Sequence, residues 1–176
     1  MPIDQRKVTC YHEAGHAVIS ELLKIGKLIY IRIYPETASP GESIYSGGAY
    51  ITGTEGNANL WEHGLLILAG AISELKYKER NDEINQWKSD EYYGGDRNKF
   101  NEIAMKISLL PENSTKTEED LFLEMWIECK NFIEKHWNKI EKIAIELYNS
   151  KQEPLDNYSS EMAAERVRQI LDLDEC

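Results

Sequence analysis

The chain has few of the features that mark disulfide-stabilised, secreted or membrane proteins. Only three cysteines occur among 176 residues, Cys10, Cys129 and Cys176, and no two of them have the C-x-x-C spacing. An odd number of scattered cysteines argues against a disulfide framework and favours a reducing compartment. The longest apolar run, Gly64 to Ile72, has about half of the ~20 residues that a membrane helix needs. No signal sequence opens the chain, so we expect a soluble, cytoplasmic protein without membrane insertion.

The chain also lacks an excess of basic residues. Lysine and arginine total 20 and aspartate and glutamate total 31, which gives a formal net charge of −11. Such a charge repels phosphate backbones and anionic lipid, so no nucleic-acid partner is expected. No internal repeat or low-complexity tract divides the chain, and its length and 41% hydrophobic content fit one compact domain.

A pattern typical of zinc hydrolases lies near the N-terminus. Residues 11–17 are Tyr-His-Glu-Ala-Gly-His-Ala, within a segment predicted to be helical from about Asp4 to Lys24. His12 and His16, four residues apart, face one side of such a helix and can bind one tetrahedral ion together. Glu13 is placed to accept a proton from a water that the ion activates. This H-E-x-x-H signature predicts one Zn²⁺ per chain, with Glu13 as the general base.

Apolar residues on the flanking turns predict that the two histidines are buried in a cleft. These residues are Val8, Ala14, Ala17, Val18, Ile19, Leu22 and Leu23. A pair of core histidines that hydrogen-bond to the backbone is the alternative. Gly15 costs about 1 kcal/mol relative to alanine inside a helix, so it indicates the close approach of another backbone or of a ligand.

Two predicted strands follow the first helix, which ends at Gly26. Lys27 to Tyr34 is rich in β-branched and aromatic residues, and Tyr45 to Thr52 pairs back on it. Gly47 and Gly48 in the second strand have two interpretations. Paired glycines form a bulge or bend, or they mark a sheet edge to which an extended peptide adds as a further strand.

The rest of the chain is predicted to be mainly helical, so the fold class is α+β, mostly α-helical. One helix, capped by Asn57 or Asn59, runs to about Lys78, and the polar segment 79–93 is expected to be a mobile loop or a helix extension. The remaining predicted helices cover 97–110, 118–150 with a Thr115/Glu118 capping box, and a last segment from Ser159 or Ser160 to Leu171.

Two carboxylates outside the motif are further candidates for the site. Glu74 lies near the end of an apolar helix face, where it either turns to solvent or finds a histidine or metal partner. Asp96 follows Gly94 and Gly95 at the start of a predicted helix. A carboxylate there is by default a helix cap, but it can also supply the protein ligand that zinc with two histidines still lacks.

Residues 6–18, Arg-Lys-Val-Thr-Cys-Tyr-His-Glu-Ala-Gly-His-Ala-Val, closely resemble the zinc-motif helix of the FtsH-type peptidases, the protease domain of membrane-anchored AAA proteases. Later landmarks are also similar to that family: a Gly-Gly strand, a helix with Ala-Gly-Ala-Ile-Ser-Glu-Leu at 69–75, a Gly-Gly-Asp turn that opens a helix, and a long and a short helix. The resemblance implies a zincin-like peptidase domain over 1–176, with the zinc site and β edge in 1–110 and C-terminal helices in 111–176.

The resemblance also implies roles for individual residues. Asp96 becomes the third zinc ligand beside His12 and His16, and Glu74 supports a zinc-ligating histidine from outside the ligand set. The substrate-binding edge of the family maps onto Gly47, Gly48, Ala49, Tyr50 and Ile51.

The chain departs from the family in three respects. No Gly-x-x-x-x-Gly-Lys-Ser/Thr phosphate loop occurs, so the ATPase module is missing, as are its transmembrane helices. Ala71 replaces the family's arginine in the Ala-Gly helix, and the segment before Gly94 differs from the family's serine- or threonine-containing approach. A separate unfoldase partner is therefore an open expectation, as is the self-association that the family's hexamers suggest.

The expected function is that of an ATP-independent zinc metalloendopeptidase that cleaves flexible or unfolded polypeptides. Two alternatives stay open at this point. One is a regulatory protease of the ImmA type that is specific for one repressor partner. The other is a catalytically silent, zinc-stabilised module that binds extended peptides.

Overall fold

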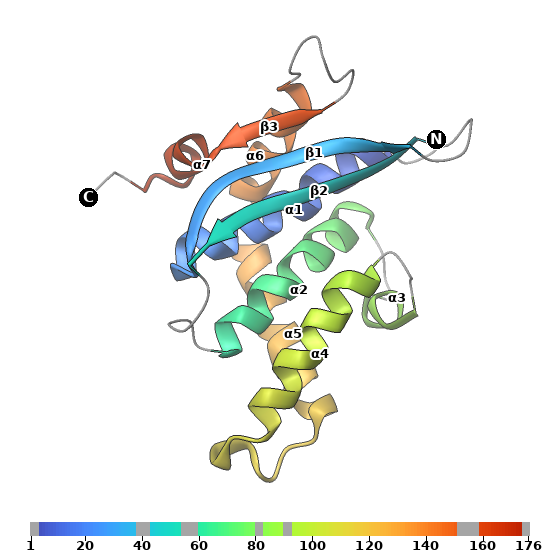
Figure 1. Cartoon of the computed structure of the whole chain (residues 1–176), viewed down its shortest axis with the longest axis vertical. Helices are drawn as coiled ribbons and strands as arrows, with labels where there is room; N and C mark the ends of the chain where they lie inside the picture. The colour runs from blue at the N-terminus through green and yellow to red at the C-terminus, as the bar shows by residue number, and fades with distance from the viewer. Residues whose placement is uncertain are drawn as a thin grey trace.

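The computed structural model of the chain describes residues 4–37, 43–53, 60–79, 83–89, 93–150 and 159–173. In chain order its elements are α1 (Gln5–Leu23), β1 (Lys27–Thr37), β2 (Ser43–Thr52), α2 (Leu60–Tyr77), α3 (Glu83–Ser89), α4 (Gly94–Ser108), the 3-10 helix η2 (Pro111–Asn113), α5 (Glu118–Lys135), α6 (Trp137–Asn149), β3 (Ser160–Ala163) and α7 (Ala164–Leu171). The predicted class, mostly helical with a small sheet, is confirmed. Figure 1 shows the sheet lying across α1 at one end of the molecule, with α4 extending toward the other end.

The sheet has three antiparallel strands in the order β2-β1-β3. Ile31 of β1 lies opposite Ala49 of β2 on one side and opposite Met162 of β3 on the other. Leu28, Ile31 and Ile33 are buried, so one face of β1 belongs to the core. Within the described residues β2 pairs only with β1, and its other edge is the one next to α1.

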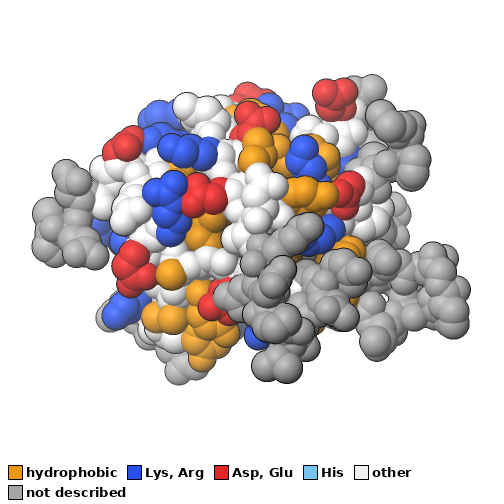
Figure 2. Space-filling view, turned by 90° about the horizontal axis from the view of Figure 1, so that it is seen from above, with side chains coloured by type: hydrophobic (Ala, Val, Ile, Leu, Met, Phe, Trp, Pro, Cys, Tyr) orange, Lys and Arg blue, Asp and Glu red, His pale blue; other side chains and the backbone are white. Residues whose placement is uncertain are grey.

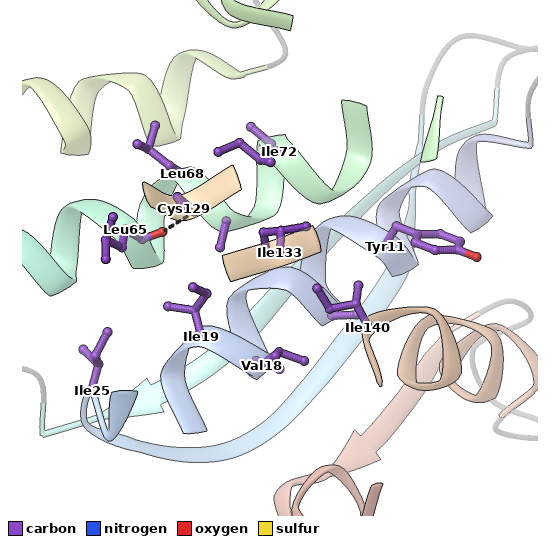
Figure 3. Packing of buried hydrophobic residues seen from close by; sticks show 14 of the residues in the cluster. Tyr11, Val18, Ile19, Ile25, Leu65, Leu68, Ile72, Cys129, Ile133 and Ile140 are labelled. Carbon is purple, nitrogen blue, oxygen red and sulfur yellow. Dashed lines mark hydrogen bonds between the residues drawn. The ribbon is translucent and has the colours of Figure 1, made fainter. Parts of the chain in front are cut away.

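The first helix is the centre of the core, because it packs against α2, α6 and both long strands. Figure 3 shows Val18 of α1 next to Ile140 of α6, and Ile133 of α5 between α1 and α2, with all of these residues in one buried cluster. Tyr11 stacks on Tyr77 at 4.1 Å and on Trp137 at 5.4 Å between ring centroids. This burial explains why the sequence of α1 is almost wholly small or apolar around the motif.

Gly15 lets α1 and α2 approach closely. A Cβ atom built on Gly15 would lie 2.3 Å from Ser73 Oγ and 2.5 Å from the carbonyl oxygen of Ala69. Both distances are shorter than any non-bonded contact allows. The predicted close approach of another backbone at Gly15 is therefore confirmed, and the backbone belongs to α2.

Cys10 and Cys129 are buried cysteines that form no disulfide, and Cys176 lies outside the described residues. Burial raises the pKa of Cys10 to about 12, so the thiol stays protonated at neutral pH. None of the helices in the described part of the chain combines the length and apolarity that crossing a bilayer requires.

Charges of both signs are interspersed on the face shown in Figure 2. Several of the ion pairs of the described residues join the C-terminal elements to the rest of the molecule. Arg168 of α7 pairs with Glu21 of α1 at 2.8 Å, and within the C-terminal part Arg166 of α7 pairs with Glu146 of α6 at 2.5 Å. The acidic excess of the sequence is thus partly neutralised locally.

Two predictions for the C-terminal part are wrong. The long helix expected over 118–150 is broken at His136, whose φ of −109° and ψ of 13° are not helical. The break lets α5 pack on α2 while α6 packs on α1, and a continuous apolar pattern does not reveal such a change of direction. Ser160 does not start the last helix but the strand β3, and α7 begins only at Ala164. Ser160 is fully buried and its hydroxyl accepts a hydrogen bond from Arg6, which favours the strand.

Two local predictions are also corrected. The capping box of α5 is formed by Thr117 and Asp120, two positions later than predicted for Thr115 and Glu118. The polar segment before Tyr93 contains the short helix α3, anchored by the buried side chain of Trp87. The predicted caps Asn57 and Asn59 lie outside the described residues.

The contact at Gly15 gives a stability prediction. In the metal-free protein, Gly15→Ala should lower the free energy of unfolding by about 1–3 kcal/mol, the usual cost of overpacking a core. For a domain of this size each kcal/mol lowers the Tm by about 2–4 °C. The matched control is Gly95→Ala, since a Cβ on this exposed helical glycine meets nothing within 4 Å. Equal melting temperatures of the two variants in calorimetry would contradict the packing of α1 against α2.

Candidate metal centre

Three potential metal ligands from two helices meet at the surface of α1. The Nε2 atoms of His12 and His16 are 3.1 Å apart. Oδ2 of Asp96, in the first turn of α4, lies 3.2 Å from Nε2 of His12 and 3.8 Å from Nε2 of His16. Residues 84 positions apart in the sequence, His12 and Asp96, are thereby brought together.

The outer nitrogens of the two rings are held by acceptors. Nδ1 of His12 donates to Oε2 of Glu74 at 3.1 Å, and Nδ1 of His16 donates to the carbonyl oxygen of Leu66 at 2.7 Å. Because a carboxylate and a carbonyl accept but do not donate, both neutral rings carry their proton on Nδ1. Both Nε2 lone pairs then point toward each other and toward the carboxylate of Asp96. Three acceptors that converge in this way could hold a cation between them.

The dimensions and chemistry of the group fit a zinc ion. Zn²⁺ bonds to histidine nitrogen and carboxylate oxygen at about 2.0–2.1 Å, which separates two ligand atoms of a tetrahedron by about 3.3 Å. The three observed separations of 3.1, 3.2 and 3.8 Å lie around this value. Two imidazoles and one carboxylate are a ligand set of catalytic zinc sites, which leave the fourth position open.

The electrostatics of the site also favour positive charge at this point. Burial opposes a charged ring, but hydrogen bonds with Asp96 and Glu74 raise the pKa of His12 to about 10. Burial likewise opposes the charge of Asp96, yet hydrogen bonds from His12 and His16 hold the pKa of this carboxyl well below its usual range. Without a metal ion, protonated His12 supplies the positive charge between the acceptors. A bound cation would take over this role.

Glu74 is the buried centre of a hydrogen-bond network. Its side chain is fully buried, and besides His12 it accepts hydrogen bonds from the hydroxyl of Tyr93 at 2.9 Å and from Lys78. Burial raises the pKa of Glu74, but the hydrogen bonds from His12 and Lys78 outweigh it and lower the pKa. Glu74 was predicted either to turn to solvent or to find a histidine or metal partner, and its carboxylate is in fact buried against His12.

Glu13 lies beside this group and under strand β2. It is 5% exposed, and its carboxylate accepts a hydrogen bond from the backbone N–H of Ala49. Among the described residues its buried Oε2 atom has no hydrogen-bond partner. Burial raises the pKa of Glu13, so it binds a proton more readily than an exposed carboxylate does.

Two glycines leave space for these side chains. A Cβ on Gly47 would lie 2.7 Å from Cγ and from Oε1 of Glu13. A Cβ on Gly70 of α2 would lie 2.4 Å from Nε2 of His16 and 2.6 Å from Nε2 of His12. Gly70 therefore borders the point where the ion would sit, a role that the sequence analysis missed although it singled out the Ala-Gly stretch.

A cavity of about 300 Å³ opens over the three ligands. Its lining includes the site residues, the edge of β2, an apolar wall and one lysine. The lining residues are His12, Glu13, His16, Gly47, Gly48, Ala49, Ile51, Leu66, Ile67, Asp96 and Lys99.

The structure separates the predicted site residues into two groups. All of the predicted ligands and Glu13 lie in or beside the cavity, as do four of the five residues predicted for the substrate edge. The exception is Tyr50, which is 53% exposed and stacks on Tyr30 at 5.2 Å, because successive side chains of a strand point to opposite faces. Asp96 is not a helix cap, since Tyr93 is the N-cap of α4 and no side-chain cap bond is present there.

No model of a known protein family matches the chain, and a search of curated proteins finds none that is similar to it.

The position of Gly70 gives a prediction for metal binding. Gly70→Ala should weaken zinc binding by about 10–100-fold, because the added methyl group displaces both histidine rings at the usual overpacking cost of 1–3 kcal/mol. The matched control on the same helix is Gly64→Ala, whose Cβ meets the flexible side chain of Met125 and no ligand. Competition titration with a chromophoric chelator measures the affinity. Equal zinc affinities of the two variants would show that Gly70 does not border the ion.

Proposed function

We propose that this chain is a zincin-like, zinc-dependent peptidase that hydrolyses extended, unfolded polypeptides without ATP. Three acceptor atoms, from His12, His16 and Asp96, converge beside a buried carboxylate of which one oxygen has no partner among the described residues, and this geometry supports the proposal. His12, His16 and Asp96 would hold the zinc. When bound, zinc would polarise the scissile carbonyl and lower the pKa of the attacking water.

Glu13 would act as the general base and then as the general acid. Its carboxylate accepts a proton from the attacking water as the oxygen bonds to the scissile carbonyl carbon. The same proton then passes to the amide nitrogen as the carbon–nitrogen bond breaks, which yields a carboxylic acid and an amine. The second water proton then moves from the acid to the amine to leave a carboxylate and an ammonium group. The raised pKa of Glu13 supports both steps, because a carboxylate with a pKa nearer neutrality accepts and releases protons more evenly.

The outer edge of β2 would align the substrate. On this edge the Tyr45 carbonyl oxygen accepts a hydrogen bond from Thr9, and the Ala49 N–H donates to Glu13. The stretch from Gly47 to Ile51 borders the cavity, so a substrate strand laid along it would cross the metal centre. An extended, unfolded chain fits this edge better than a folded surface does.

The regulatory protease and the silent binding module stay as alternatives to a general peptidase. All three would use the same metal ligands and the same strand edge. A polypeptide substrate, a cytoplasmic location, self-association and a separate unfoldase remain expectations of the resemblance to FtsH-type peptidases. Cleavage of an unfolded, casein-like substrate distinguishes a general peptidase from both alternatives, and Glu13→Gln tests whether that cleavage depends on Glu13.

Glu13→Gln should retain zinc but lower the cleavage of an unfolded, casein-like substrate by about 10²–10⁴-fold, the usual contribution of a general base. The matched control is Glu165→Gln, an exposed glutamate on α7, which should cleave like the wild type. Full activity of Glu13→Gln would remove the proposed mechanism. If the wild type and both variants bind zinc and peptide but none of them cleaves the substrate, the result would support the silent binding module instead.

The cavity wall gives a prediction for substrate preference. Ile51, Leu66 and Ile67 are apolar, so a substrate side chain beside the scissile bond should also be apolar. Peptides with leucine at that position should show a kcat/KM at least about tenfold higher than the same peptides with aspartate. Ile67→Ser should reduce this ratio. Equal cleavage of the leucine and aspartate peptides by the wild type would exclude the apolar wall as a determinant of specificity.

A further inference from the structure

Tyr93 joins the metal centre from a position that the sequence does not mark. It is the N-cap residue of α4 and stands three residues before Asp96. Its side chain is buried, with 1% exposed, and its hydroxyl donates to Oε1 of Glu74 at 2.9 Å. Tyr93 itself is not among the residues that line the cavity.

The hydrogen bond of Tyr93 closes a ring of contacts through three helices. Glu74 of α2 accepts from Tyr93 with one oxygen and from Nδ1 of His12 with the other. Nε2 of His12, on α1, lies 3.2 Å from Oδ2 of Asp96 on α4. Tyr93 and Asp96 both lie at the start of α4, so these contacts form a closed ring.

The first turn of α4 is held by contacts of Tyr93 and Arg97 rather than by its two glycines. Cβ atoms built on Gly94 and Gly95 meet nothing within 4 Å, so this turn does not pack closely through either residue. The tyrosine ring lies 5.6 Å from the ring of Trp87, and Arg97 donates to the carbonyl oxygen of Trp87 at 2.6 Å. These contacts fix the turn against α3, whereas the Tyr93 hydroxyl fixes it against the carboxylate that orients His12.

We infer that Tyr93 is a positioning residue of the metal centre, whose hydroxyl holds Asp96 in register with the histidines through Glu74. The inference rests on the proposed zinc site but not on catalysis. It explains how an aspartate that follows two glycines is held against ligands on another helix. Groups that hydrogen-bond to metal ligands from outside, as Glu74 does to His12, typically contribute 10–100-fold to metal affinity, and Tyr93 would act through Glu74.

Tyr93→Phe tests the inference, because it removes the hydroxyl and keeps the ring on Trp87. It should weaken zinc binding by about tenfold, the lower end of the range for groups bonded directly to a ligand, because Tyr93 acts one hydrogen bond further away and Lys78 still holds the same oxygen of Glu74. The visible spectrum of the Co²⁺-loaded variant should also shift, since the carboxylate ligand is less constrained. The control is Tyr148→Phe, which removes a hydroxyl that donates to Asp4 at 2.7 Å and should leave both readouts unchanged.

A double-mutant cycle with Glu74→Gln separates positioning from general stabilisation. If Tyr93 acts through Glu74, its removal in the Glu74→Gln background should change zinc affinity by less than about threefold. A full tenfold loss in that background would overturn the inference. Unchanged zinc affinity together with an unchanged Co²⁺ spectrum of Tyr93→Phe would also overturn it, and a lowered metal-free Tm would then show a purely structural role. A wild-type protein that binds no zinc would overturn the proposed function as well, which distinguishes the two failures.

Discussion

The structure depends on the meeting of three acceptors, two imidazole nitrogens and one carboxylate oxygen, in a place where they repel one another without a cation. Their outer atoms are already occupied, His12 by Glu74 and His16 by the Leu66 carbonyl, so neither ring can turn its N–H inward without losing a buried hydrogen bond. In the ion-free protein a proton on His12 relieves the repulsion. The same geometry offers two nitrogen ligands and one oxygen ligand to a small cation.

The fold supplies the close approaches that this arrangement needs. Gly15 brings α2 against α1, and on α2 the absence of a side chain at Gly70 leaves room beside both rings. Gly47 lets Glu13 rest under β2, where Ala49 holds it. Each glycine is needed because a neighbouring group occupies the space where a Cβ would stand. The core around Val18, Leu68 and Ile133 keeps these backbones in place.

The sequence predicted those parts of the structure that local patterns determine. The spacing of His12 and His16 placed both rings on one face, and the apolar positions of α1 predicted their burial. The role of Asp96 remained undecided between helix cap and metal ligand, because its contact with the histidines arises from the tertiary packing of α4. Tyr93 and the break at His136 were missed for the same reason, since a tyrosine in a polar segment and a non-helical residue within an apolar repeat leave no local signal. Ser160 became a strand residue because β1 offered an unpaired edge, which only the tertiary structure shows.

The most direct test of the central claim is metal analysis of the purified wild type beside Asp96→Ala, with zinc supplied and excess removed. We expect close to one zinc per wild-type chain and a strongly reduced content in Asp96→Ala, both with the same circular dichroism spectrum. Equal zinc contents of the two proteins, or none in a folded wild type, would contradict the metal centre formed by His12, His16 and Asp96.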